Sequence, residues 1–211
     1  MGFLQLFRRP EPIRDAGALA QFIDENAAFV AQKGIYEYSR ARAGHYAKVL
    51  FREQAFLDAV EQSRWRAYPL GIALVTELAE GVLRPHAADQ SRQRDALNAV
   101  VLAVFDRYPV PAPLDARTWS ALRGDLSRRL ELIGQHPPKR AMDIPEPFAE
   151  AYFNLMPIHP KLRAGEQHTI GNYLRLTMCN IHDKLIKRLD FAAVVRSLCG
   201  TERGARSHRS A

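Results

Sequence analysis

The sequence predicts an all-α fold: a single-domain helical bundle of about six to eight helices with Pro-rich connecting loops. Apolar residues recur three and four positions apart through most of the chain, and no stretch shows the alternation of a strand. The 211 residues are 47% hydrophobic, enough for one core without disulfides. We expect the domain to cover residues 15–199, between an apolar and basic tip at 1–14 and a disordered basic tail at 200–211.

The first helix is expected over residues 15–33, with Asp15 as its N-cap and apolar residues on one side. Gly34 can end it, although residues 36–50 continue the helical pattern and could belong to the same helix, bent. A further helical segment opens near Arg52.

Prolines set the expected boundaries of the middle helices. Pro69 should break or kink the segment that opens near Arg52, and a new helix should begin there and stop at Pro85. Residues 87–107 form another helix. Three prolines within residues 109–113 then make a stiff linker, because proline fixes φ and favours extended backbone.

The second half of the chain opens with its most regular amphipathic helix, which Asp115 caps and Gly134 ends. A proline-punctuated loop over 136–147 leads to a short helix that ends near Met156. A second such loop leads to a long helix over 166–189, and a last ordered piece follows over residues 191–198.

The long helix over 166–189 carries the one polar constellation in the sequence. Its apolar stripe is accompanied by a second row, at offsets of four, three, four and three residues: His168, Asn172, Arg175, Cys179 and His182. At 3.6 residues per turn these five project to nearly the same side. A solvated face is usually built from Lys, Glu, Asp and Arg, so we expect the row to be mostly buried against another helix or in an enclosed pocket.

Three interpretations of this row stay open. In a structural seam, each polar group would be paired with backbone or with another helix. In a ligand pocket, Arg175 would be the charge partner of a polar or anionic molecule. In a metal site, Cys179 and His182 would chelate one edge of a zinc ion. The further candidates His159 and His168 match no zinc spacing, so we expect no metal and no cofactor.

The net charge of +7 belongs largely to the two ends of the chain. Residues 1–14 and 200–211 each carry a net +2, which leaves +3 for the 185 residues between them. The expected membrane contacts lie in the tip: Phe3, Leu4, Leu6, Phe7, Arg8 and Arg9. Apolar side chains followed by arginines favour reversible docking at an anionic membrane surface. The alternative is that this tip folds back onto the core or is disordered.

Tyrosines and arginines alternate in the segment from Tyr36 to Tyr46. Such a mixture could stack bases or bind phosphates. In the alternative interpretation, the tyrosines are half-buried with their hydroxyls at the rim, and Arg40 and Arg42 pair with Glu37 or another acid. Nucleic acid is therefore a possible partner but not the favoured one.

The segment from Arg42 to Val60, RAGHYAKVLFREQAFLDAV, resembles the recognition-helix end of tetracycline-repressor-like regulators. The resemblance implies an all-α regulator with a compact three-helix head in the first ~60 residues and a positive face on that head. The polar row would then line its effector pocket. Upstream of Arg42, however, the chain is one long amphipathic run without the turn glycine of such a head, so the regulator is kept as a rival hypothesis.

The sequence contains none of the common catalytic signatures. It has no Gly-rich phosphate loop, no Gly-x-Ser-x-Gly, no His-Glu-x-x-His and no paired Glu-x-x-His. We therefore expect a cytoplasmic, non-enzymatic binding or accessory protein that works through protein contacts or self-association, at the inner face of a membrane. The alternatives are the DNA-binding regulator and a helical enzyme or small-ligand binder that uses the polar row.

Overall fold

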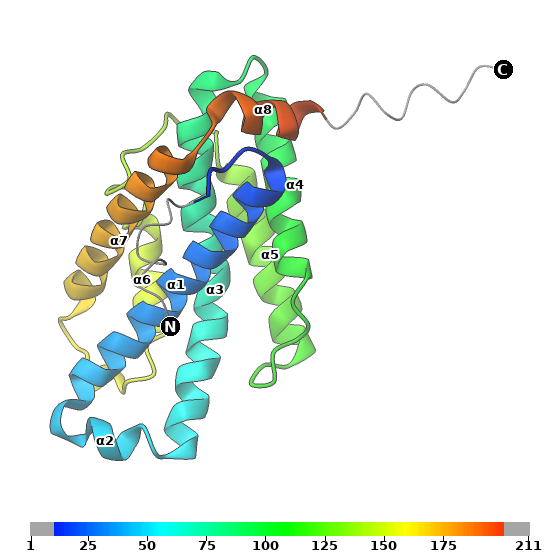
Figure 1. Cartoon of the computed structure of the whole chain (residues 1–211). Helices are drawn as coiled ribbons and strands as arrows, with labels where there is room; N and C mark the ends of the chain where they lie inside the picture. Colours follow the sequence, from blue (N-terminus) through cyan, green and yellow to red (C-terminus); the bar gives the residue numbers. More distant parts are fainter. Residues whose placement is uncertain (1–10, 201–211) are drawn as a thin grey trace, which may run out of the picture.

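The computed structural model describes residues 11–200, and over this range the chain is a helical bundle, as predicted. The helix α3 (Gln54–Leu83) runs through the middle. The helices α1 (Ala16–Ala43), α4 (Gln90–Asp106), α5 (Ala116–Leu132) and α7 (Gln167–Arg188) surround it (Figure 1). Within residues 11–200 the only β-type pairing is one isolated bridge.

The helix α1 is one continuous helix that passes through Gly34. The carboxylate of Asp15 accepts a hydrogen bond from the Ala18 amide, which confirms the predicted N-cap. Gly34 does not end the helix, because its role is in packing: a Cβ there would collide with the Tyr152 hydroxyl. The helix ends instead at Gly44, whose φ of 51° favours glycine.

A short 3-10 turn, η2 (Gly44–Tyr46), and the helix α2 (Ala47–Leu50) connect α1 to α3. The predicted break at Pro69 is wrong: α3 continues through it, and every residue from 67 to 80 is buried. A proline inside a helix costs about 3 kcal/mol through its missing N–H and its steric clash. The apolar surface that α3 buries on all of its sides over residues 67–80 offsets that cost.

The helices α4 and α5 pack beside α3 as an antiparallel pair (Figure 1). A 3-10 turn, η3 (Arg84–His86), joins α3 to α4. The predicted cap of α5 is confirmed, because the Asp115 carboxylate accepts from the Thr118 amide at 2.7 Å. Gly134, with a φ of 85°, follows the end of α5, as predicted.

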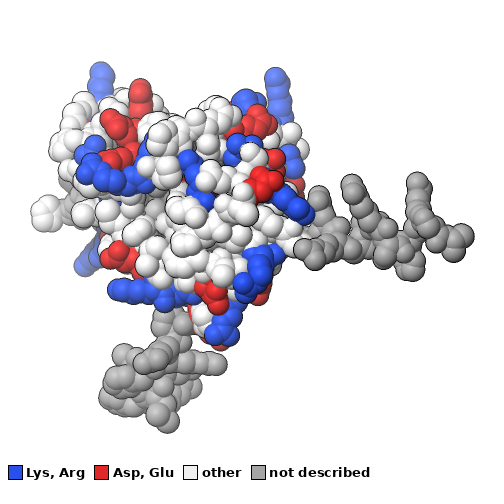
Figure 2. Space-filling model, turned by 90° about the horizontal axis from the view of Figure 1, so that it is seen from above, with Lys and Arg blue, Asp and Glu red and all other residues white. Residues whose placement is uncertain are grey.

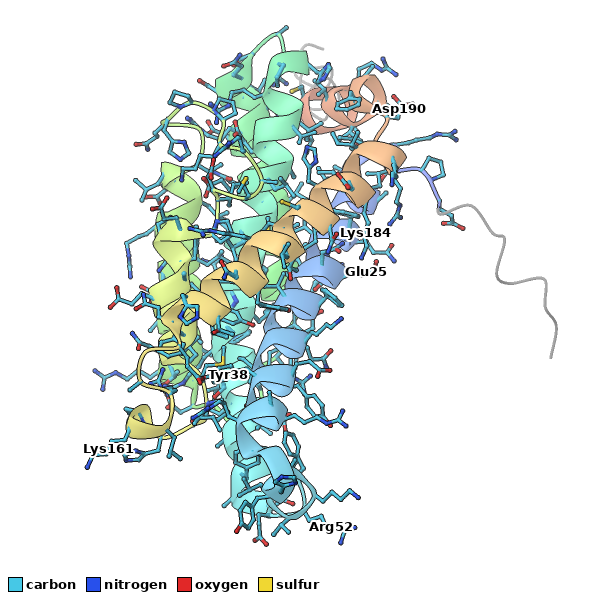
Figure 3. The ribbon with its side chains drawn as sticks, turned by 90° about the vertical axis from the view of Figure 1, so that its left-hand side faces the viewer. Glu25, Tyr38, Arg52, Lys161, Lys184 and Asp190 are labelled. Carbon is cyan, nitrogen blue, oxygen red and sulfur yellow. The ribbon has the colours of Figure 1, made fainter. Side chains whose placement is uncertain are left out.

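The last third of the chain packs across the bundle. It consists of η4 (Glu146–Phe148), α6 (Ala149–Asn154), η5 (Pro160–Leu162), α7 and α8 (Phe191–Cys199). The helix α7 crosses the outside of α1 and α3 (Figure 3).

The described residues ahead of α1 are fastened to the junction of α7 and α8. Ile13 is fully buried, and its amide donates to the Arg188 carbonyl at 2.8 Å. Its carbonyl accepts from the Asp190 amide at 2.9 Å, which completes the isolated bridge to Leu189. The end of the segment 1–14 is thus part of the folded domain. The expected membrane-contact residues Phe3–Arg9 and residues 201–211 of the expected tail lie outside the described residues.

The bundle end that carries α8 has no uniformly basic surface. Figure 2 looks onto this end and shows lysine and arginine side chains interspersed with acidic ones around a largely uncharged centre. Mixed charge of this kind is ordinary for a protein surface. It gives no electrostatic footprint for a nucleic acid on this face.

Candidate functional site

The predicted apolar stripe of α7 faces the core, but the polar row beside it does not. The stripe residues are all buried: Ile170, Leu174, Met178, Ile181 and Leu185. In the row, by contrast, His168, Asn172 and Arg175 are exposed, and Cys179 and His182 are half-buried. The prediction that this row is mostly buried is therefore wrong.

The geometry of α7 explains the error. The row lies roughly a quarter-turn or more around the helix from the buried stripe. Since α7 crosses the outside of the bundle, the side that carries the stripe reaches the core, and the row is left on the flank. Unusual residue types on a helix flank therefore do not by themselves indicate burial.

The first half of the row lines an open groove of about 570 Å³ beside α7. One wall comes from η4, the residue before it and α6: Pro145, Glu146, Ala149 and Phe153. The other comes from α7 and the residue Gly165, and includes His168, Asn172 and Arg175. Cys179 and His182 do not line it.

The groove contains polar groups that the described part of the chain leaves unused. The side chains of Asn172 and Arg175 make no hydrogen bond or ion pair with a described residue. His168 is held by its own turn, with Nδ1 3.0 Å from the Gly165 carbonyl oxygen. Glu146, on the opposite wall, is exposed and also makes no ion pair with a described residue. The groove therefore presents both an unpaired cation and an unpaired carboxylate.

Next to the groove, Asp143 is paired by its own loop. Its carboxylate accepts from Arg140 Nε at 2.6 Å, which lowers the pKa of Asp143. The charge of Arg175 lowers the pKa of Asp143 further, although the two side chains are not in contact. Because Arg140 already occupies this carboxylate, Arg175 keeps its hydrogen-bond donors for another acceptor.

A second cluster of charged residues lies at the end of α3 and was not predicted. Glu77 and Glu80 are 8% and 2% exposed, within an otherwise apolar run. Arg84 donates two hydrogen bonds to the Glu80 carboxylate, from Nε at 2.8 Å and from Nη2 at 2.6 Å. Lys139 Nζ lies 2.8 Å from Glu77 Oε1, and His136 Nε2 lies 3.5 Å from it.

We assign this cluster a structural role, because each buried carboxylate has a cationic partner at contact distance. Arg84 also donates to the His136 carbonyl oxygen at 2.7 Å, so α3 is tied to the loop after α5. The sequence signal was available in the segment ELAE at 77–80, where two acids interrupt a stripe of leucines. The leucine spacing predicts the helix, but it says nothing about the role of these two acids.

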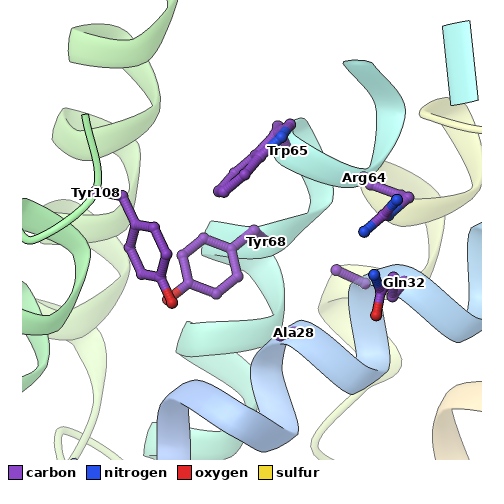
Figure 4. A pocket seen from close by; sticks show the side chains of 7 residues that line it. Ala28, Gln32, Arg64, Trp65, Tyr68 and Tyr108 are labelled. Carbon is purple, nitrogen blue, oxygen red and sulfur yellow. The ribbon is translucent and has the colours of Figure 1, made fainter. Parts of the chain in front are cut away.

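A third polar cluster connects α1, α3 and the end of α4. The hydroxyls of Tyr68 and Tyr108 both donate to the Asp24 carboxylate, at 2.6 and 2.9 Å. Figure 4 shows the two rings meeting edge to face beside Trp65, next to a hollow of about 80 Å³. Burial and then the hydrogen bond to Asp24 raise the pKa of both tyrosines. The hollow is too small for more than a few waters, so we assign the cluster a packing role.

The segment Tyr36–Tyr46 divides into a structural part and a surface part. Tyr38 is buried and donates to Glu166 Oε2 at 2.7 Å; burial first and then this bond raise the pKa of Tyr38 to about 12. Arg42 pairs with Glu166 at 2.9 Å. Tyr36 and Tyr46, in contrast, are exposed, by 43% and 74%.

No three His, Cys, Asp or Glu side chains within residues 11–200 are arranged to hold a metal ion. The two cysteines, Cys179 and Cys199, are free thiols. None of the helices described by the structure is both long and apolar enough to cross a membrane.

Comparison with known proteins adds nothing to this geometry. No protein-family model, no curated protein and no solved structure matches the chain.

Proposed function

We propose that the protein is a non-enzymatic helical binding protein that works through protein contacts and receives a segment of a partner polypeptide in the α6–α7 groove. The observation that supports the proposal most directly is the state of the Arg175 side chain. Its guanidinium lines an open groove and forms no hydrogen bond or ion pair with any described residue. An arginine in this state is suited to a two-bonded contact with a carboxylate.

A polypeptide fits the groove because the groove is mixed in character. Asn172 offers an amide donor and acceptor, which match the hydrogen-bonding groups of a peptide backbone. Glu146 and Arg175 offer opposite charges on opposite walls, so an occupant with side chains of both signs is complementary. Ala149 and Phe153 add an apolar part to the lining of the same groove.

Selection from a displayed random-peptide library on the purified protein tests this proposal. We expect the enriched peptides to carry an acidic residue. Arg175→Glu should weaken their binding about ten- to a hundredfold, the value of one charge-assisted contact. Lys187→Glu, an exposed charge reversal on α7 away from the groove lining, is the matched control and should leave binding unchanged. Enriched peptides that bind Arg175→Glu as well as wild type would refute the proposal.

The alternative occupant of the same groove is a small polar or anionic molecule, because the volume of the groove falls in the range of small-ligand sites. A panel of small carboxylates and phosphates, screened by thermal shift, distinguishes the two. Stabilisation that is lost in Arg175→Glu, without any enriched peptide, would favour the small ligand.

The regulator hypothesis has less support from the geometry. Within residues 11–60 the chain forms the single long helix α1, the short helix α2 and the start of α3, rather than a compact three-helix head. The helix α1 packs along α3 as part of the bundle. The described part of the chain therefore lacks the compact head that the regulator hypothesis requires.

We also propose that the binding protein is peripheral to a membrane, through Phe3, Leu4, Leu6, Phe7, Arg8 and Arg9. The support is the sequence of four apolar residues followed by two arginines. Removing residues 1–9 should weaken sedimentation with anionic vesicles at low salt, and added salt should weaken it in the full chain. Equal sedimentation of the full and shortened chains would exclude this contact.

A further inference from the structure

The connection between α1 and α3 forms one extremity of the molecule. We define the α1–α3 corner as residues 40–52, which include the end of α1, η2 and α2. Figure 1 shows this corner projecting beyond the other helices, and Figure 3 shows Arg52 at its outer end. No residue of η2 or α2 is buried. The corner therefore contributes little to the core.

Two side chains at this corner expose much apolar surface. Tyr46 is 74% exposed and Val49 is 57% exposed. The backbone that carries them is held by an aromatic contact, because the Phe51 ring packs between Tyr36 at 5.0 Å and Phe56 at 5.2 Å. The two exposed side chains are thus presented on a supported turn.

The charge of the corner is of one sign. Residues 40–52 contain Arg40, Arg42, Lys48 and Arg52 and no acid. Arg42 is occupied by Glu166, but the other three side chains make no hydrogen bond or ion pair with a described residue. Arg40 and Lys48 line one open hollow together with His45 and with Glu37, the acid that lies just before the corner. Three available cations therefore accompany two exposed apolar side chains.

We propose that the α1–α3 corner docks on an anionic lipid bilayer, with Tyr46 and Val49 in the interface and Arg40, Lys48 and Arg52 among the headgroup phosphates. Tyrosine prefers the interface because one end of its ring is apolar and the other is polar. Cationic side chains beside the apolar ones add attraction to anionic lipid. This site goes beyond the groove and uses none of its residues.

A lipid surface fits the corner better than a nucleic acid. The acid-free stretch is short: Glu37 precedes it, and Glu53 and Asp58 follow it, all three exposed. A nucleic-acid strand needs a longer continuous basic surface to bind its phosphates. Lipid headgroups are separate molecules, so each can bind a single cation of the projecting corner. Val49 has no stacking surface for a base but inserts readily among acyl chains.

The test is sedimentation of the full chain with vesicles of phosphatidylcholine alone and with added phosphatidylserine. We expect binding to the mixed vesicles only. Both Lys48→Glu/Arg52→Glu and Tyr46→Ser/Val49→Ser should weaken it at least about tenfold. The matched controls are Lys187→Glu and Leu132→Ser; both sites are exposed and lie far along the chain from the corner, and binding should persist. Circular dichroism checks that each variant is folded.

Three outcomes would overturn the proposal. Folded corner variants that sediment like wild type would show that the corner does not touch lipid. Binding that survives those variants but is lost in Arg8→Glu/Arg9→Glu would assign the contact to the N-terminal tip instead. Absence of vesicle binding, with oligonucleotide binding that depends on Lys48 and Arg52, would identify the partner as nucleic acid. Since none of these variants alters Arg175, failure here leaves the groove proposal untouched.

Discussion

Single residues in this protein illustrate how burial decides what a side chain does. Glu80 is 2% exposed, and its carboxylate accepts two hydrogen bonds from Arg84. The hydrogen bond to Glu80 raises the pKa of the Arg84 guanidinium, so Arg84 stays charged. A buried carboxylate that loses its partner has neither water nor a counter-charge to stabilise it.

We expect Arg84→Met to lower the free energy of unfolding by about 3–5 kcal/mol, because it leaves the Glu80 charge buried and unpaired. The double variant Glu80→Leu/Arg84→Met should recover most of the loss, since it removes both charges. Urea unfolding measures both. If the double variant is no more stable than the single one, the Glu80–Arg84 pair is not the source of the loss.

Gly71 allows α1 and α3 to approach closely. A Cβ on Gly71 would lie 2.6 Å from the Ala27 carbonyl oxygen of α1, and that backbone atom cannot move aside. We expect Gly71→Ala to cost about 1–3 kcal/mol by overpacking. Gly124→Ala is the control: its Cβ would meet only the flexible end of Arg128 at 3.6 Å, and alanine should gain about 0.5–1 kcal/mol inside the helix. Thermal unfolding measures the stability of both variants. Equal changes in stability in the two would contradict the packing argument.

At this scale the sequence predicted the capping residues correctly and the effect of Pro69 wrongly. Asp15 and Asp115 act through the next three residues, so a local pattern suffices to recognise them. Pro69 was expected to break or kink a helix, and Gly34 left two alternatives open, an end of the first helix or its continuation. Their roles depend on Tyr152 and on the burial around α3, which no local window contains.

Among the elements, α7 separates what periodicity can predict from what it cannot. Its apolar stripe and its extent were predicted, because a buried stripe repeats at the helical period. The position of the row beside that stripe depends on which neighbours pack along the flank. The sequence contains no direct record of those neighbours, and so the expected burial from His168 to His182 was wrong.

Because Arg175 is exposed and lines an open groove, replacing it should not affect folding. We expect Arg175→Leu to change the free energy of unfolding by no more than about 0.5 kcal/mol, as at other surface sites. Chemical denaturation measures it, with the core change Leu174→Ala as a contrast that should cost about 2–5 kcal/mol. A loss from Arg175→Leu as large as that from Leu174→Ala would mean that the row is a structural seam after all.

At the scale of the whole molecule, buried tyrosines link stability to alkaline pH. Burial is the largest cause that raises the pKa of Tyr38 and of Tyr173 to about 12, and it also raises the pKa of Tyr152. In the unfolded chain a tyrosine ionises near pH 10. Between about pH 10 and 12 the unfolded state therefore binds fewer protons than the folded state, and stability falls as pH rises.

We expect the free energy of unfolding to be steady with respect to these tyrosines below about pH 10 and to decrease above it. Urea unfolding across this range, with tyrosinate absorbance as a second signal, measures the slope. Tyr173→Phe should make the slope shallower, because one of the linked groups is removed. An unchanged slope would show that Tyr173 ionises equally in both states.

The central claim is that the groove between α6 and α7 receives a partner polypeptide, and hydrogen–deuterium exchange locates that contact directly. With a selected peptide at saturation, amides over residues 146–153 and 165–176 should exchange more slowly. Exchange elsewhere, including the α1–α3 corner, should not change. Arg175→Glu should remove the protection at the same peptide concentration. Protection confined to another surface, or protection of the groove that persists in Arg175→Glu, would contradict the claim.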